Sequence, residues 1–304
     1  GLGQFHAKDI GPAKTLAIEG VIDILVADEV EAVAVAKRYL SYFQGKIKQW
    51  KAPKQEALYD ILPEDRRYAY DINAIINTIA DFDTALELRA QFAKNMVTAL
   101  IRIEGKPYGV IANSTRHLGG ANDSDAADKA ARFLQLCNAF NLPVISLCDT
   151  PGFMVGPEHE AKGLIRHSSR LFLSAAALEV PLITIVLRKA YGLGAMAMAG
   201  GSFHASFLTL AWQSGEFGAM GLEGAVKLGY KKELEVIKDE KERQHLYDQL
   251  VAQEYEKGKA INAAETLEFD EVIDPVETRN RIATAHSCIN LNLKNNTNSF
   301  IDSW

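Results

Sequence analysis

The sequence predicts an α/β fold whose central sheet is mostly parallel. Stretches typical of strands alternate with amphipathic stretches long enough for helices, and such alternation produces right-handed crossovers between parallel strands. The run at residues 182–187 is apolar apart from Thr184, as expected of a strand that is covered on both faces. The length of 304 residues suits one large domain or two smaller ones.

The amino-acid composition is that of a globular protein and argues against several functional classes. Hydrophobic residues make up 48% of the chain and charged residues 24%, which is typical of a globular protein. The net charge of −6 lacks the basic character of a dedicated nucleic-acid-binding protein. The three cysteines include no C-x-x-C pair, so we expect neither a disulfide framework nor a thiolate zinc site, and we expect a reducing, cytoplasmic location.

No membrane span is expected either. The longest apolar run, residues 171–187, is interrupted by Glu179 and Pro181. The chain has no signal-peptide pattern, and it begins with Gly1 rather than Met. This start suggests processing, an expression scar or a fragment of a longer protein.

The first elements are expected as follows. Residues 20–26 predict a strand, and the helix after it begins near Asp28 and carries an apolar stripe as far as Phe43. Residues 45–55 are rich in lysine and contain Pro53, without hydrophobic periodicity, and predict a linker.

In the middle of the chain, the pattern predicts a helix over residues 72–81 and a second helix start near Thr84. Two strands follow, at residues 97–103 and 108–111. The loop at residues 113–123 carries a Gly-Gly pair. Asp123 or Ser124 should cap the next helix, whose expected buried face consists of Ala130, Phe133, Leu134 and Cys137.

The second half continues the alternation. A strand at residues 142–147 ends abruptly at Asp149, and a helix with an apolar stripe spans residues 164–175. The strand at residues 182–187 runs into a glycine-rich turn at residues 191–195. Residues 231–257 are charged and helical, which is more typical of a packing or oligomerisation element than of a catalytic one.

A short internal similarity suggests a duplication. The tripeptide Val-Ile-Asp occurs at Val21 and again at Val272, and both copies precede an acidic helix start. If both copies close a similar domain, that domain spans roughly 250 residues, a plausible single-domain size. Chance is the alternative, because the match is short.

The turn at residues 191–195 is the strongest local signal for chemistry. The first N–H groups of a helix lack intrahelical partners, and glycine lets a ligand oxygen approach them closely. Such a turn can therefore bind an anion or stabilise an oxyanion, or it can be a plain strand-to-helix turn. Gly192, Gly194 and Ala197 also satisfy a loose dinucleotide pattern, but Glu216 is a poor match for the expected acidic partner.

Two other loops are candidates. Pro151 and Gly152 set a turn after a strand, and Phe153 offers either a stacking surface or a core side chain. In the glycine-rich stretch at residues 215–224, Glu216 and Glu223 are expected to be exposed loop charges.

Several catalytic signatures are absent from the sequence. It contains no phosphate-binding P-loop, no H-E-x-x-H and no G-x-S-x-G. His117, His167 and His204 are expected to lie on the surface or between helices. What remains are backbone N–H groups in glycine-lined turns, which suit an enolate or an oxyanion.

A set of motifs resembles one enzyme family over essentially the whole chain. In order, the runs are Asp-Thr-Pro-Gly-Phe at residues 149–153, Ile-Arg-His at 165–167, Arg-Lys-Ala-Tyr-Gly-Leu-Gly-Ala at 188–195, Gly-Ala-Met-Gly at 218–221 and Asp-Glu-Val-Ile-Asp-Pro at 270–275. Together they resemble the β-type carboxyltransferase subunit of acetyl- or propionyl-CoA carboxylases, which depend on biotin.

The resemblance implies a crotonase-like ββα spiral with two halves in tandem. Residues 1–50 resemble the C-terminal remnant of the acyl-CoA-binding half plus a linker. Residues 51–304 resemble the C-terminal, biotin-binding half. The implied reaction moves a carboxyl group from carboxybiotin to the α-carbon of an acyl-CoA.

The resemblance also implies the site and the partners. The backbone N–H groups of Leu193 and Gly194 fall on the oxyanion hole of the family, and the substrate-binding positions are Thr150, Pro151, Gly152, Phe153, Tyr191, Gly192 and Ala195. Leu193 replaces a glycine of the commoner family form, and Met196 stands where an aspartate is common. The implied partners are a biotin carboxyl carrier or biotin carboxylase subunit and further copies of the chain, without nucleic acid, membrane or bound metal.

Other functions remain open at this stage. The same half-site could serve a biotin-dependent decarboxylase. The domain could instead be a non-catalytic crotonase-like assembly element whose glycine turns only pack helices. A dinucleotide-dependent oxidoreductase is a third alternative.

Overall fold

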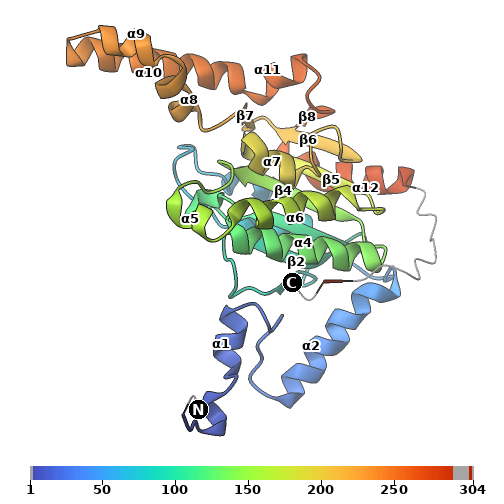
Figure 1. The fold of residues 1–304 in the computed structure, drawn as a ribbon. Helices are drawn as coiled ribbons and strands as arrows, with labels where there is room; N and C mark the ends of the chain where they lie inside the picture. The colour runs from blue at the N-terminus through green and yellow to red at the C-terminus, as the bar shows by residue number, and fades with distance from the viewer. Residues whose placement is uncertain (1–2, 290–300, 303–304) are drawn as a thin grey trace.

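A mixed sheet forms the centre of the molecule in the computed structural model, which describes residues 3–289 and 301–302 (Figure 1). The strand order is β1-β2-β3-β4-β5-β6-β8, and β7 pairs with β5 off this path. The strands are β1 (Leu86–Leu88), β2 (Met96–Ile103), β3 (Lys106–Asn113), β4 (Val144–Thr150), β5 (Leu182–Tyr191), β6 (Leu208–Trp212), β7 (Glu216–Gly218) and β8 (Glu271–Ile273).

The pairing is antiparallel at one edge and parallel elsewhere. β1, β2 and β3 pair in antiparallel fashion, whereas β3-β4, β4-β5, β5-β6, β5-β7 and β6-β8 are parallel. The predicted α/β fold with a mostly parallel sheet is therefore confirmed.

Helices cover both faces of this sheet. The helices of the described residues are α1 (Ala13–Ile18), α2 (Glu29–Ser41), α3 (Ile72–Ile79), α4 (Ser124–Ala139), α5 (Pro157–Ala161), α6 (Leu164–Ala176), α7 (Gly192–Met198), α8 (Leu222–Gly229), α9 (Lys231–Val236), α10 (Glu240–Gly258), α11 (Ala260–Glu265) and α12 (Thr278–Cys288). Those that cover the sheet include α4 and α6 on one face and α3 and α12 on the other. Short 3-10 turns occur at Ala7–Asp9, Tyr42–Gln44, Gln55–Asp60, Leu118–Gly120 and Pro275–Glu277. Along residues 3–289, none of these helices is both long and apolar enough to cross a bilayer.

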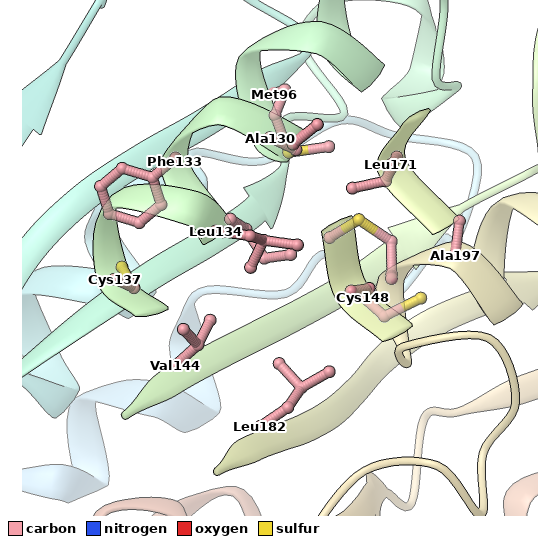
Figure 2. Packing of buried hydrophobic residues seen from close by; sticks show 14 of the residues in the cluster. Met96, Ala130, Phe133, Leu134, Cys137, Val144, Cys148, Leu171, Leu182 and Ala197 are labelled. Carbon is pink, nitrogen blue, oxygen red and sulfur yellow. The ribbon is translucent and has the colours of Figure 1, made fainter. Parts of the chain in front are cut away.

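Two hydrophobic clusters fill the space on either side of the sheet. Figure 2 shows the cluster under α4 and α6, where Phe133, Leu134 and Cys137 of α4 face strand residues such as Val144 and Leu182. The other cluster contains the isoleucines of α3, including Ile75 and Ile76. The predicted buried face of α4 is confirmed, as is the cap, because the Asp123 carboxylate accepts a hydrogen bond from the Ala126 N–H.

The strand predicted at residues 20–26 is absent from the structure. Residues 20–26 form no strand, although the following helix is present as α2 and is capped by Asp28. A strand needs a neighbour that satisfies its backbone groups, and among the described residues no strand pairs with this segment. Instead, the Asp23 carbonyl accepts from the Arg89 N–H at 2.7 Å, which holds the segment to the body of the protein as irregular chain.

The helix start predicted near Thr84 is also wrong. Residues 86–88 form β1, in which Leu86 and Leu88 are buried and Glu87 is half-buried. Pairing with β2 decides the conformation here, because a three-residue apolar-polar-apolar pattern does not distinguish a strand from a helix.

The charged stretch at residues 231–257 is helical as predicted, but it is split. α9 ends at Val236, and Asp239 caps α10 by accepting from the N–H groups of Lys241 and Glu242. In Figure 1, α8 to α11 extend away from the sheet as an arm, at the end of the molecule opposite to α1 and α2. We call α8 to α11 the C-terminal arm.

Candidate active site

Two turns predicted separately in the sequence meet at one edge of the sheet. β4 ends at Thr150 and β5 at Tyr191. These parallel neighbours pair at Thr150 and Ala190, after a shift in register between Cys148 and Thr150. The chain after β4 runs against the start of α7. A β-carbon on Gly194 would lie 2.6 Å from the Cα of Gly152, so the two backbones approach as closely as glycine permits. The carboxyl ends of parallel strands are the usual place for a ligand site in open α/β sheets.

Asn122 joins the two turns. It forms an isolated parallel bridge with Phe153, in which the Asn122 N–H donates to the Gly152 carbonyl at 3.0 Å and the Met154 N–H donates to the Asn122 carbonyl at 2.8 Å. The Asn122 side-chain amide donates to the Gly194 carbonyl at 3.5 Å. This fully buried residue was missed in the sequence. Its position directly before a helix cap and after a Gly-Gly pair was the available signal.

The turn after β4 is held from within. The Thr150 hydroxyl lies 3.1 Å from both the N–H and the carbonyl oxygen of Gly152, accepting from the first and donating to the second. Gly152 has a φ of +122°, which only glycine adopts without strain. The turn is therefore preformed before any ligand arrives.

The start of α7 presents backbone donors. Gly192 has a φ of +56°, and a β-carbon there would lie 2.7 Å from the Ala219 carbonyl oxygen. α7 begins at Gly192, so the N–H groups of Leu193 and Gly194 precede its first i→i−4 hydrogen bond. The side chain of Leu193 is 66% exposed and that of Met196 is 38% exposed, so the first turn of this helix borders solvent.

A buried ion pair ties the ends of β4 and β5 together. The Arg188 Nε lies 3.0 Å from a carboxylate oxygen of Asp149, and both side chains are almost fully buried. The other oxygen of Asp149 accepts from the Lys189 N–H at 3.1 Å. Because the carboxylate is bound on both oxygens, it fixes the spacing of the two strand ends beneath the site.

Tyr191, the last residue of β5, bonds to an acid. Its hydroxyl donates to Glu216 at 2.8 Å. Burial raises the pKa of Tyr191, and the neighbouring Glu216 charge raises it further. Burial also raises the pKa of Glu216, while the hydrogen bond from Tyr191 opposes this shift.

The expectation that Glu216 is an exposed loop charge is wrong. Its side chain is 14% exposed, because pairing of β7 with β5 draws it against Tyr191. Glu223 is exposed as expected, but it lies in the first turn of α8 rather than in a loop, and it accepts a hydrogen bond from the Tyr255 hydroxyl at 2.6 Å. Nothing local in the sequence separates the two glutamates.

The predicted site residues differ in exposure to solvent. Thr150, Gly152, Tyr191, Gly194 and Ala195 are buried, Phe153 and Gly192 are half-buried, and Pro151 and Leu193 are exposed. Phe153 packs towards α6, with its ring 6.3 Å from that of Phe172, and so favours the core interpretation. The accessible surface around the two turns therefore includes Pro151, Gly192, Leu193 and Met196.

The three histidines considered in the sequence have the expected positions. His167 bonds to Asp128 at 2.7 Å between α6 and α4, which confirms an interhelix position, and His117 and His204 are exposed. A search of residues 3–289 and 301–302 finds no cluster of three or more His, Cys, Asp or Glu side chains suited to a metal ion. The site can thus offer backbone hydrogen-bond donors next to an apolar rim.

Comparison with known proteins gives a consistent result. A family model described as "Carboxyl transferase domain" matches residues 5–300. The methylmalonyl-CoA carboxyltransferase 12S subunit of Propionibacterium freudenreichii subsp. shermanii is 36% identical over 294 residues, covering 92% of this chain and 54% of the relative. The biotin-dependent acetyl-/propionyl-CoA carboxylase beta6 subunit of Mycobacterium tuberculosis (strain H37Rv) is 37% identical over 281 residues, covering 90% of this chain and 59% of the relative.

Solved structures agree with this fold. A single-chain, multi-domain long-chain acyl-CoA carboxylase superposes with a TM-score of 0.87 at 52% identity, covering 93% of this chain and 28% of that one. The transcarboxylase 12S hexamer superposes with a TM-score of 0.84 at 32% identity, covering 94% of this chain and 56% of that one. These matches confirm the crotonase-like fold. The chain spans about half the length of the curated relatives it matches.

Proposed function

Because this chain belongs to the carboxyl transferase domain family, we propose that it is the carboxybiotin-facing half of a biotin-dependent acyl-CoA carboxyltransferase. The reaction transfers a carboxyl group from carboxybiotin to the α-carbon of an acyl-CoA. Two of the relatives described above support this proposal. One is named as a methylmalonyl-CoA carboxyltransferase subunit and the other as a biotin-dependent acetyl-/propionyl-CoA carboxylase subunit.

One observation carries the proposal for this half: the start of α7 is pressed against the turn after β4, with its first N–H groups outside the helical ladder. We assign the oxyanion hole to the N–H groups of Leu193 and Gly194. Such donors are fixed before the reaction and need no reorganisation, and losing one typically costs about 10²–10³ in rate. A backbone donor is unaffected by the change from glycine to Leu193.

The donor set suits the head group of biotin. Its ureido oxygen is a neutral acceptor that gains negative charge as the carboxyl group leaves, and neutral N–H donors stabilise that charge without requiring a buried cation. When bound, carboxybiotin supplies the activated carboxyl group, and its ureido nitrogen accepts the proton that the acyl α-carbon loses. Pro151 and Leu193 border this position as exposed apolar residues.

The other predicted site residues have supporting roles in this proposal. Thr150 holds the carbonyl and the N–H of Gly152, and Asn122 links Gly152 to Gly194. Ala195 is fully buried behind the donors, where a larger side chain would displace the helix. Phe153 anchors the turn on α6.

The partners follow from the chemistry. We propose that residues 1–50 continue an acyl-CoA-binding half, that residues 51–304 form the biotin half, and that a biotin-bearing carrier or biotin carboxylase component brings carboxybiotin. The related 12S transcarboxylase is described as a hexamer, which supports an assembly of several copies. A cytoplasmic location is in keeping with free thiols at Cys137, Cys148 and Cys288.

A longer acyl group is a second candidate substrate. The relative with 52% identity is described as a long-chain acyl-CoA carboxylase. The rim of the site carries Leu193 and Met196, both exposed and apolar, where a shorter or charged side chain would offer less contact to an alkyl chain. Comparing acetyl-, propionyl- and palmitoyl-CoA as acceptors separates the two candidates.

The direct test is reverse carboxyl transfer. A chimera would join residues 51–304 of this chain to the acyl-CoA half of the 12S relative, and turnover of malonyl-CoA and methylmalonyl-CoA would be measured with and without biocytin. We expect turnover that depends on biocytin and falls about 10²–10³-fold in Leu193→Pro, which removes one N–H at an exposed position in the first helical turn, where proline is tolerated. An assembled chimera without turnover would favour the non-catalytic assembly domain.

Binding to this chain alone provides a check that needs no chimera. Protein labelled with ¹⁵N at leucine and glycine would be titrated with biocytin. The proposal expects the amide signals of Leu193 and Gly194 to shift, while glycines far from the site, such as Gly229, stay in place. Carbon dioxide release that exceeds transfer in the chimera would favour the decarboxylase alternative.

A further inference from the structure

Tyr191 connects the end of β5 to the first turn of α7, where the proposed donors lie. It is 2% exposed, ends β5 and directly precedes the first turn of α7. Its backbone is extended, with φ −110° and ψ 131°, and its side chain makes no capping bond to α7. The direction in which α7 starts is therefore set by whatever holds Tyr191 in place.

Glu216 holds the far end of this side chain. The Tyr191 hydroxyl donates to one carboxylate oxygen of Glu216 at 2.8 Å, and Arg66 lies 3.8 Å from the other oxygen. The two residues sit on strands that pair directly, because Lys189 is opposite Glu216 and Tyr191 is opposite Gly218. The carboxylate thus has a partner on each oxygen and reaches Tyr191 from the neighbouring strand.

Arg66 is itself fixed from a second direction. Its guanidinium lies 3.0 Å from the ring centre of Tyr255 on α10. The attraction between a guanidinium and the face of an aromatic ring favours a defined position of the cation over that face. Glu216 is therefore held between the core of the sheet and the base of the C-terminal arm.

The turn that follows β7 supports the same region. The Ala219 carbonyl lies so close to Gly192 that a β-carbon there would approach it to 2.7 Å. Any shift of β7 relative to β5 would press directly on the residue before the donors. Glu216 is the one ionisable side chain of β7, the strand that carries this contact.

We propose that Glu216 is a positioning residue for carboxyl transfer, which holds Tyr191 and thereby aligns the N–H groups of Leu193 and Gly194. Glu216 does not contact the reacting atoms. Its role in catalysis rests on the proposed function, whereas its effect on the geometry of the turn does not.

Three variants and one control test this role. Glu216→Ala removes both partners, Glu216→Gln keeps an acceptor for the Tyr191 hydroxyl, and Tyr191→Phe removes the donor while keeping the ring. Glu235→Gln is the control, because Glu235 is an exposed acid of α9 whose ion pair with Lys231 lies outside this network. Thermal unfolding of each variant verifies that the protein is folded.

The first readout is the geometry of the turn without substrate. In this chain labelled with ¹⁵N, Glu216→Ala should shift the amide signals of Leu193 and Gly194, and Glu216→Gln should shift them less. Glu235→Gln should leave them in place. If Glu216→Ala leaves both signals where they are in the wild type, the positioning role is wrong, whatever the activity.

The second readout is the split between kcat and KM in the chimera described above. Misplacement of a catalytic group by about 1 Å can cost about 10²-fold, so we expect kcat to fall 10- to 100-fold in Glu216→Ala while KM for the acyl-CoA stays unchanged. Combining Glu216→Ala with Tyr191→Phe should lower kcat little further, because both act through one hydrogen bond. Fully additive losses would overturn the proposal.

The two readouts separate failure of the inference from failure of the function. Shifted amides in a chimera whose wild type transfers no carboxyl group would refute the carboxyltransferase assignment and keep the structural role of Glu216. Unshifted amides in an active chimera would refute the role of Glu216 and keep the function.

Discussion

Gly194 and Gly152 are in backbone contact, since a β-carbon on Gly194 would lie 2.6 Å from the Cα of Gly152 and 2.6 Å from its carbonyl carbon. The residues are 42 positions apart in the sequence, and each follows the end of its own strand. Their contact makes the turn after β4 and the start of α7 a single surface. The proposed oxyanion hole depends on this contact, because it sets where the donors of α7 face.

The first prediction concerns this contact. Gly194→Ala should force the two turns apart and lower the free energy of unfolding by about 1–3 kcal/mol, as overpacked sites do. Biocytin-dependent transfer should fall with it. Gly229→Ala is the control, because nothing lies within 4 Å of a β-carbon there. Chemical denaturation measures the free energy of unfolding of both variants. Equal stability of the two would contradict the close contact between Gly194 and Gly152.

The second prediction concerns Asn122. Its side-chain oxygen accepts from the Asn113 amide at 2.9 Å, so Asn122→Ala leaves a buried donor unsatisfied. We expect a loss of about 1–3 kcal/mol in the free energy of unfolding. Asn77→Ala, on the exposed side of α3, should change stability little. The midpoint of urea unfolding measures both, and a neutral Asn122→Ala would mean that the side chain does not tie the turns.

The third prediction concerns the ion pair beneath the site. Asp149→Asn leaves Arg188 buried without its counter-charge, which typically costs about 3–5 kcal/mol. The exposed pair of Lys231 and Glu235 provides the contrast, and Glu235→Gln should have little effect. Differential scanning calorimetry would compare the two variants. Similar unfolding temperatures would show that the 3.0 Å ion pair of Asp149 and Arg188 contributes little to stability.

The fourth prediction concerns pH. Lys129 is buried with its Nζ 2.8 Å from the Phe92 carbonyl, and burial lowers its pKa to about 8. Between about pH 8 and the unfolded value near 10.4, the unfolded chain binds a proton that the folded protein lacks, so stability rises with pH across this window. The gain from Lys129 is on the order of 2–3 kcal/mol.

Comparison with a variant isolates this contribution. The free energy of unfolding of the wild type minus that of Lys129→Met should increase between pH 8 and 10. The same difference for Lys37→Met, at an exposed position on α2, should stay flat. A flat difference for Lys129→Met as well would mean that this lysine keeps an ordinary pKa in the folded protein.

Much of the site was accessible from the sequence because its parts are local. The turns at residues 149–153 and 191–195 are marked by Pro and Gly at strand ends, and these residues restrict the backbone wherever they occur. The assignment of the two turns to one site came from the family resemblance. Asn122, the residue that binds one turn to the other, gave no signal strong enough to be singled out.

The sequence by itself determined the elements whose cause lies within a few residues. The cap at Asp123, the apolar face of α4 and the largely apolar first part of β5 follow from local hydrogen bonding and periodicity, and all are present in the fold. The tertiary structure alone decided which segments have partners. Residues 20–26 are strand-like in composition but have no strand beside them, whereas Glu216 lies in a polar turn and is drawn inward by pairing of β7 with β5. Strand formation and burial depend on neighbours distant in the chain, and a single sequence does not specify those neighbours.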